Sequence, residues 1–336
     1  MRIFRFIFIC LILPYAFICC QRKEMSLEKE YPLMGTFLQI NVRECRSFTQ
    51  EELEKILNEA YNKGKEIESR FSLYDKNSEL TSFNSQEEGI YSVSMDFMEL
   101  LVLSHQIYLI TDGAFDPTIK PLVERWGFYV HQNTSKPGAD DLKDIMQRIG
   151  MDKLDLDINN NIVIKKSKVE LDFGGIGKGF AVDRISRYLL ESGCSKFLVN
   201  LGGNLYACNR TGDDFLWRIG IKDPEGGDEP YKIIKTANRG ISTSASYYNF
   251  LTKDGDVLSH IIDPKTGYPV DHRVSATIIS DSAGLSDGLS TAFCVLGHEK
   301  SSHVASELVD MDGIILVTGD GDCLEYMVNN FDRLTD

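Results

Sequence analysis

A glycine-rich segment that ends in a lysine is the first part of this sequence with residues suited to chemistry. It reads Leu171-Asp172-Phe173-Gly174-Gly175-Ile176-Gly177-Lys178-Gly179. Glycines let the backbone approach a ligand closely, and the N–H groups at a helix start favour phosphate, to which Lys178 would add a positive charge. The spacing is neither G-x-G-x-x-G, because Phe180 stands at the last glycine position, nor a Walker A loop, because Gly179 follows the lysine. The alternative is a flexible turn with a solvated lysine.

A carboxylate and a hydroxyl four residues apart form the second candidate. The segment Ser286-Asp287-Gly288-Leu289-Ser290-Thr291 is expected to be helical, which places Asp287 and Thr291 on one face. Mg²⁺ takes few protein ligands, all of them hard oxygens, and completes its octahedron with water and phosphate oxygens. The pair therefore predicts a magnesium site. The alternative is a surface aspartate that caps the helix or interacts favourably with the helix dipole.

A histidine ahead of a Pro-x-x-Gly turn is the third candidate. His260 is followed by Ile261-Ile262-Asp263-Pro264-Lys265-Thr266-Gly267, and we expect a strand over 257–262 with the histidine in its interior. Histidine titrates near neutral pH and can act as a general base. The alternative is an ordinary strand histidine.

A loop with an aromatic residue is the fourth candidate. It reads Asp112-Gly113-Ala114-Phe115-Asp116-Pro117-Thr118 and leads on to Trp126-Gly127-Phe128. By itself, such a loop is as compatible with core and turn as with a ligand site.

Positioning these segments requires a scaffold of both helices and strands. Thr49 and Glu52 form a capping-box pattern at the start of the first helix. Helices are expected over 49–67, 94–107, 140–149, 181–191, 286–296 and 300–309. Strands are expected over 154–157, 162–164, 169–173, 197–201, 204–208, 217–221, 257–262, 276–280 and 314–318. Strict βαβ alternation is missing, so we predict an α+β fold: a single compact domain of mixed or antiparallel sheets with packed helices, with room for two subdomains.

Composition excludes several classes of protein. The chain has 336 residues, 43% of them hydrophobic and 26% charged, which is typical of a globular protein. Its net charge is −14, and a dense Lys/Arg stripe, the usual mark of a nucleic-acid binder, is missing. Beyond the first 20 residues, five cysteines remain without a C-x-x-C pair, which argues against a zinc site and against a disulfide framework.

The N-terminus has the pattern of an export signal. Two arginines within the first five residues precede an apolar run from Phe6 to Cys20, which is short for a membrane-spanning helix. We predict a lipoprotein-type signal peptide over 1–20, a folded domain over 25–336, and a lipid anchor at Cys20 or at Cys19. The residues just before these cysteines are larger than usual for such a signal. This pattern predicts a periplasmic, membrane-anchored protein, and the alternative is an uncleaved membrane anchor.

Taken together, the segments resemble the ApbE family of FAD:protein FMN transferases. The resemblance covers nearly the whole mature chain, in order. It is carried by Met34-Gly35-Thr36, Ser72-Leu73-Tyr74, Ser78-Glu79-Leu80-Thr81-Ser82-Phe83-Asn84, Asp112–Thr118, Trp126-Gly127-Phe128, the segment from Asp172 to Asp183, Asn200-Leu201-Gly202-Gly203-Asn204, His260–Gly267 and Asp287–Thr291. One departure is Ala245, where the family often has glycine, which puts the local loop geometry in question.

The resemblance implies a role for each matching position. The positions that match the family's FAD-lining residues are Met34, Tyr74, Ala114, Phe115, Asp116, Asp172, Lys178 and Ile261. Asp287 and Thr291 match the side-chain ligands of Mg²⁺, and Gly175 matches a position whose backbone carbonyl binds the metal. His260 matches the histidine proposed to deprotonate the acceptor hydroxyl.

The implied activity is Mg²⁺-dependent transfer of the FMN half of FAD to a Thr or Ser of another protein, with release of AMP. The family's acceptors are flavin subunits of membrane redox complexes. Two alternatives stay open from sequence: an Mg²⁺-dependent FAD pyrophosphatase that yields FMN and AMP, and a non-catalytic flavin-binding lipoprotein.

Overall fold

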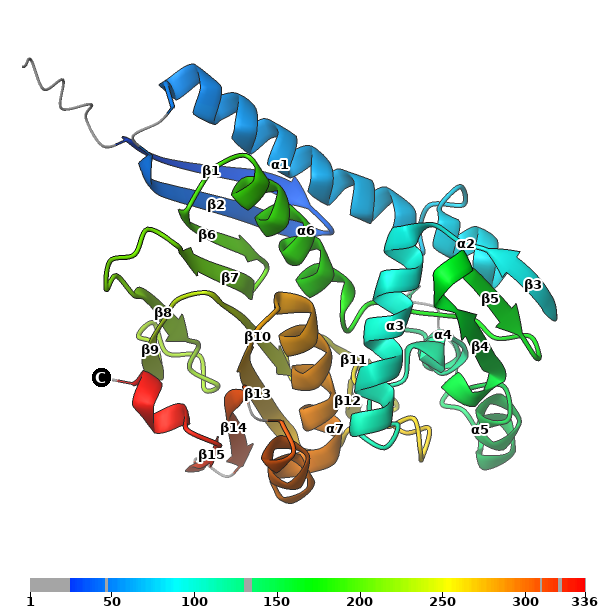
Figure 1. Ribbon diagram of the computed structural model, residues 1–336. Helices are drawn as coiled ribbons and strands as arrows, with labels where there is room; N and C mark the ends of the chain where they lie inside the picture. Colours follow the sequence, from blue (N-terminus) through cyan, green and yellow to red (C-terminus); the bar gives the residue numbers. More distant parts are fainter. Residues whose placement is uncertain (1–24, 46–47, 130–134, 309, 320–321, 336) are drawn as a thin grey trace, which may run out of the picture.

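An eight-stranded sheet runs through the molecule (Figure 1). The computed structural model describes residues 25–45, 48–129, 135–308, 310–319 and 322–335. In spatial order the strands are β1 (Met25–Leu33), β2 (Thr36–Cys45), β6 (Lys196–Leu201), β7 (Asn204–Asn209), β10 (Arg239–Ala245), β13 (Arg273–Ser280), β14 (Asp312–Gly319) and β15 (Asp322–Val328). All neighbours in this sheet pair antiparallel.

Helices cover one face of this sheet. The α-helices of the described residues are α1 (Gln50–Phe71), α2 (Glu79–Asn84), α3 (Met95–Ile110), α4 (Lys120–Trp126), α5 (Ala139–Met146), α6 (Gly177–Glu191) and α7 (Ala283–Ser306). Helix α6 packs on β6 and β7, helix α7 packs on β10 and β13, and the two helices pack against each other (Figure 1). Residues more than 100 positions apart in the chain are thereby brought together.

Apolar residues alternate between the two faces of the central sheet. On β13, Ile278 packs into the main core with α6 and α7, whereas its neighbour Ile279 packs into a second core on the opposite face. That second core is closed by β8 (Trp217–Ile221), β9 (Lys232–Thr236) and the short helix η4 (Phe331–Leu334). Because both faces are covered, β13 is buried continuously from Val274 to Ser280 rather than alternating between buried and exposed residues.

Two further small sheets, in addition to the two-stranded sheet of β8 and β9, complete the fold. Strands β3 (Gly89–Ser92), β5 (Ile162–Lys165) and β4 (Leu154–Asp157) form one, and β11 (Phe250–Lys253) and β12 (Asp256–Ser259) form the other. The remaining short helices are η1 (Pro117–Ile119), η2 (Met151–Lys153) and η3 (Ile158–Asn160). A third apolar cluster joins α4 and α5 and includes Trp126 and Ile262.

The predicted α+β class with antiparallel sheets and packed helices is confirmed. The capping box at the start of α1 is also present: Glu52 N–H donates to Thr49 Oγ1 at 3.3 Å, and Thr49 N–H donates to the Glu52 carboxylate at 2.8 Å. The two helices expected over 286–296 and 300–309 form the single element α7, which is broken at Gly297, where φ is +71°. Position 309 lies outside the described residues.

The strand predicted over 169–173 is wrong. This segment pairs with no strand among the described residues, because side-chain and loop groups take its backbone hydrogen bonds. Leu171 N–H donates to Asn84 Oδ1 at 2.7 Å, the Leu171 carbonyl accepts from Asn84 Nδ2 at 2.8 Å, and Asp172 N–H donates to the Pro117 carbonyl at 2.7 Å. The following helix, α6, also begins at Gly177 rather than at 181.

The predicted signal peptide and its cysteines lie outside the described residues. In the described part, no helix is long and apolar enough to cross a membrane. Three of the remaining cysteines, Cys194, Cys208 and Cys294, are buried as free thiols, and Cys323 is partly buried. Ala245 is the last residue of β10, opposite Ser275 on β13, so ordinary strand backbone accommodates it.

Candidate active site

A cavity of about 1460 Å³ opens where the glycine-rich turn, the start of α7 and the β11–β12 hairpin meet. Every residue predicted from sequence to belong to the site lies on its wall. These residues are Met34, Tyr74, Ala114, Phe115, Asp116, Asp172, Gly175, Lys178, His260, Ile261, Asp287 and Thr291. The structure thus brings the predicted set together, while the role of each residue stays a prediction.

The glycine-rich turn is held by its own backbone and by Asp172. Gly174 N–H donates to Asp172 Oδ1 at 2.6 Å, and the Phe173 carbonyl accepts from the N–H groups of Ile176 and Gly177. The turn then enters α6, whose N-cap residue, Ile176, offers no side-chain cap. The positive end of this helix therefore points into the cavity region, an arrangement that favours an anion.

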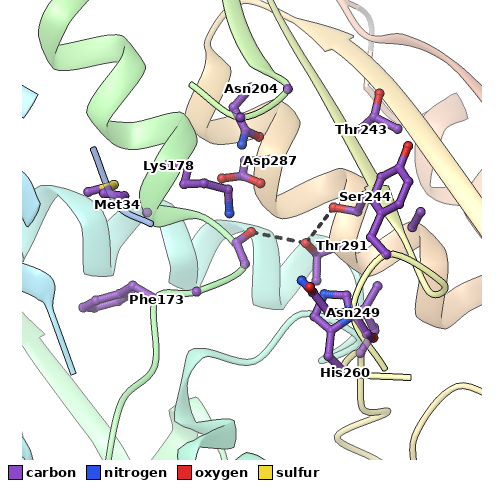
Figure 2. A pocket seen from close by; sticks show the side chains of 18 of the residues that line it. Met34, Phe173, Lys178, Asn204, Thr243, Ser244, Asn249, His260, Asp287 and Thr291 are labelled. Carbon is purple, nitrogen blue, oxygen red and sulfur yellow. Dashed lines mark hydrogen bonds between the residues drawn. The ribbon is translucent and has the colours of Figure 1, made fainter. Parts of the chain in front are cut away.

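Two hydrogen bonds connect this turn to α7. Gly179 N–H donates to Asp287 Oδ2 at 2.9 Å. Thr291 Oγ1 donates to the Gly175 carbonyl at 3.3 Å (Figure 2). A Cβ at position 179 would lie 2.3 Å from the Ala283 carbonyl oxygen and 2.7 Å from the Asp287 Cβ. Gly179 is therefore needed for close helix packing rather than for contact with a ligand.

The alternative interpretation of Asp287, a surface aspartate that caps the helix, is wrong. Its side chain is only 4% exposed, and Figure 2 shows it facing the Lys178 side chain. Burial raises the pKa of Asp287, against the opposing effects of the Lys178 cation and the Gly179 N–H. A buried carboxylate with a cation beside it suits a further positive charge from a ligand or a metal.

The oxygens gathered here fit Mg²⁺. Among the described residues, no group of three or more His, Cys, Asp or Glu side chains could hold a metal, so a metal in this cavity would have to be bound by Asp287 together with a hydroxyl and a carbonyl. Adjacent ligands of an octahedral Mg²⁺ lie about 3 Å apart. Thr291 Oγ1 and the Gly175 carbonyl oxygen, 3.3 Å apart, are close to that spacing.

His260 faces the same cavity from the hairpin side. The prediction that it lies inside a strand is wrong, because β12 ends at Ser259. Its backbone N–H and its ring Nδ1 both approach the Asn249 carbonyl oxygen, at 3.1 and 3.0 Å. Because a carbonyl only accepts, Nδ1 carries the proton and Nε2 keeps its lone pair. Burial lowers the pKa of His260 below 6.5, against the Asn249 hydrogen bond, and the Lys178 cation lowers it further.

The far wall of the cavity carries the aromatic and acidic residues. Tyr74 is 78% exposed, which leaves its ring available to a ligand. Asp116 Oδ1 accepts from the N–H and the hydroxyl of Thr118, so this carboxylate caps η1 in addition to lining the cavity. The phenol of Tyr129 donates to Asp172 Oδ2. Asp172 thus connects the glycine-rich turn to the segment after α4.

Sequence reasoning missed four residues of the site. Ser244 Oγ lies 3.1 Å from Thr291 Oγ1 and 2.8 Å from Ser290 Oγ, and Tyr129 bonds Asp172. Asn204 lines the cavity with a buried Oδ1 that has no partner in the described structure. Asn249 acts through its backbone carbonyl, and because every residue type has this group, no signal in the sequence was available for it. For Ser244, the polar run from Thr243 to Ser246 at the end of a strand was an available signal.

Comparison with known proteins gives a consistent result. Residues 34–315 match the sequence profile of the ApbE family. The chain is 30% identical to the FAD:protein FMN transferase of Haemophilus influenzae over 332 residues, and this alignment covers 94% of each protein. It is 32% identical over 298 residues to the FAD:protein FMN transferase of Escherichia coli K12, which covers 86% of this chain and 83% of that protein.

Solved structures agree in fold over almost the whole chain. The flavin transferase ApbE from Vibrio cholerae superposes with a TM-score of 0.81 at 27% identity and covers 93% of this chain and 99% of its own. The ApbE protein from Thermotoga maritima gives a TM-score of 0.83 at 27% identity, with 93% and 100% covered. This chain belongs to the ApbE family.

Proposed function

We propose that this protein transfers the FMN moiety of FAD to a Thr or Ser hydroxyl of an acceptor protein and releases AMP. The observation that carries the proposal is the meeting of Asp287, Thr291 and the Gly175 carbonyl beside Lys178, with His260 on the same cavity. Relatives that match over most of this chain are named FAD:protein FMN transferases, which supports the same activity.

The phosphate half of the reaction would take place between α6 and α7. Asp287, Thr291 and the Gly175 carbonyl would hold Mg²⁺, which supplies positive charge to the pyrophosphate when bound. Lys178 and the start of α6 add fixed positive charge at the same place. In phosphoryl transfer, positioning and charge stabilisation matter more than covalent help from the protein, and these groups provide both.

The acceptor half of the reaction would take place at His260. The acceptor oxygen forms a bond to the FMN-side phosphorus, the bond from that phosphorus to the bridging oxygen breaks, and AMP leaves with the electron pair. The proton of the acceptor hydroxyl passes to Nε2 of His260, the nitrogen left free by the Asn249 contact. A lowered pKa keeps this nitrogen unprotonated at neutral pH.

The test combines purified protein, FAD, Mg²⁺ and a candidate flavin subunit with a reactive Thr. Mass spectrometry should show the acceptor heavier by FMN less one water, together with one AMP per modified acceptor. A parallel incubation without acceptor measures hydrolysis. AMP and FMN released as fast without the acceptor as with it would make the protein an FAD pyrophosphatase instead. Bound FAD with no product in either mixture would make it a flavin carrier.

The cellular setting is part of the same proposal. The basic and apolar N-terminus supports export and lipid attachment at Cys20 or Cys19, and flavin subunits of membrane redox complexes are the acceptors we propose. A labelled fatty acid should be incorporated into the wild-type protein in cells. It should not be incorporated once both cysteines are replaced by serine.

A further inference from the structure

Asp183 connects the two helices that carry the predicted metal ligands. It lies on α6, less than two turns after Lys178, and its carboxylate reaches the start of α7. Oδ1 accepts from the Ala283 N–H at 2.8 Å, and Oδ2 accepts from the Gly284 N–H, also at 2.8 Å. One side chain thus fixes two successive backbone groups of the neighbouring helix.

The start of α7 has an N-cap of its own in addition to Asp183. Ser282 is the N-cap of α7, and its Oγ accepts from the Leu285 N–H at 3.1 Å, which is the usual capping bond. The Asp183 bonds come from a different helix and fix where α7 lies rather than whether it forms. Close packing supports this contact, since a Cβ at Gly284 would be 3.1 Å from Asp183 Oδ2.

Burying the ionised carboxylate of Asp183 costs free energy of folding. Burial raises its pKa to about 6, even though two backbone N–H groups and the cations Arg184 and Arg187 favour the ionised form. At neutral pH the folded protein therefore holds a buried carboxylate whose desolvation outweighs its hydrogen bonds.

We propose that Asp183 is a positioning residue that sets the place of α7 against α6 and so holds Asp287 and Thr291 opposite the Gly175 carbonyl. This inference rests on the proposed function, because it assigns the two α7 residues to a metal. Gly175 precedes α6, whereas the other two ligands lie about one and two turns after Gly284 on α7. A small shift between the helices would separate the two halves of the site.

The experiment compares Asp183→Asn with Asp281→Asn, a matched control at an exposed aspartate just before α7. Mn²⁺ binding to the FAD-free protein is followed by the loss of the free-ion electron paramagnetic resonance signal. Outer-shell partners of metal ligands are typically worth 10–100-fold in affinity. We expect Asp183→Asn to weaken Mn²⁺ binding by about that factor and the control to leave it unchanged.

Three further readouts separate positioning from a general structural role. Thermal unfolding of Asp183→Asn should fall only modestly, because the amide oxygen keeps one of the two N–H bonds and the loss of the buried charge offsets part of the cost of the amide nitrogen that faces the other N–H. FAD affinity in EDTA should be nearly unchanged. Hydrogen exchange should accelerate at the first turns of α7 and not elsewhere. Asp183→Glu, which restores a carboxylate, should recover part of the metal affinity.

The inference is overturned if Asp183→Asn binds Mn²⁺ as tightly as the wild type, or if it loses metal and FAD affinity equally along with its thermal stability. If Asp183→Asn does not fold, Asp183→Glu is measured instead, and unchanged Mn²⁺ affinity in that variant also overturns the inference. A wild type that binds no Mn²⁺ contradicts the metal site of the proposed function. The positioning of α7 is then judged by hydrogen exchange, where identical exchange in both proteins rejects it.

Discussion

The cavity is built from two regions of different character. On one side, α6 and α7 pack against the central sheet and bury Asp287 between them. On the other side, His260 follows the hairpin β11–β12, which forms a separate two-stranded sheet and exposes Phe250 and Val257. The helix side is held by contacts across the core, and the hairpin side is held by contacts near the surface.

This difference matches the two partners of the proposed reaction. A pyrophosphate is small and always the same, so a buried, preorganised group of charges can stabilise its transition state. An acceptor protein is large and must approach from solvent, so the base has to lie on an accessible part of the molecule. Changes on the helix side should therefore affect chemistry or stability, and changes on the hairpin should affect the use of the acceptor.

The largest effect is expected on the helix side, at Asp287. We expect Asp287→Ala to lower transfer by about 10⁴-fold, since loss of a metal that stabilises the transition state removes several kcal/mol. Mass spectrometry of the acceptor measures this loss, with the exposed Asp281→Ala as a control that should stay active. Full flavinylation by Asp287→Ala would show that the reaction does not depend on a metal held there.

At the hairpin side, His260→Ala tests the base. Transfer should fall by about 10²–10³-fold, because the acceptor hydroxyl loses the group that takes its proton. FAD affinity, measured by flavin fluorescence, should stay within a few fold of the wild type, since the phosphate groups are held on the other side. Wild-type transfer rates in this variant would rule out His260 as the base.

Two glycines in the first turn of α6 test how closely this helix packs against α7. Gly179→Ala should destabilise the protein by about 1–3 kcal/mol, because the new methyl group meets the backbone of α7. Gly177→Ala is the matched control, since its Cβ would lie 3.9 Å from the nearest atom, an ordinary contact. Urea unfolding of the FAD-free proteins measures both. Equal stability of the two variants would mean that the α6–α7 contact is looser than described.

The pH dependence reports on the hairpin side. Protonated His260 cannot accept a proton, so kcat/KM should fall about tenfold per unit as pH drops below the pKa of the free enzyme's histidine. Burial and the Lys178 cation lower this pKa, so the acid limb should have its midpoint below 6.5. Rates of transfer at saturating Mg²⁺ between pH 5 and 8 measure it. A midpoint above 6.5 would mean that another group is the base or that a carboxylate faces His260 in solution.

Sequence patterns predicted the helix side of the site better than the hairpin side. The i and i+4 spacing of Asp287 and Thr291 has a fixed meaning on a helix, and the glycines before Lys178 indicated a close approach. The resemblance to the ApbE family then supplied which segments belong together, and the structure places all of them on one cavity. Local pattern alone gave no means to pair residues more than 100 positions apart.

What sequence could not predict depends on backbone groups and on distant partners. The segment 169–173 has the composition of a strand, but the Asn84 amide takes its hydrogen bonds from 87 residues away. The orientation of His260 depends on the Asn249 carbonyl, and any residue type supplies the same atom. Gly179 belongs to the glycine-rich segment that suggested close approach to a ligand, whereas the group it makes room for is α7.

The smallest effect, and the one most specific to the hairpin, is expected for Phe250. Its side chain is 57% exposed, borders the cavity, and follows Asn249, whose carbonyl holds the base. We expect an acceptor whose hydroxyl reaches Nε2 to contact this ring, so Phe250→Ala should raise the KM for the acceptor by about fivefold, or roughly 1 kcal/mol of apolar contact. Both kcat and the affinity for FAD should stay unchanged. Phe37→Ala is the control, because Phe37 is 59% exposed on β2 but does not line the cavity. An equal rise in KM for both variants would mean that the acceptor does not bind at the hairpin. The helix side and the hairpin side would then no longer serve different partners of the reaction.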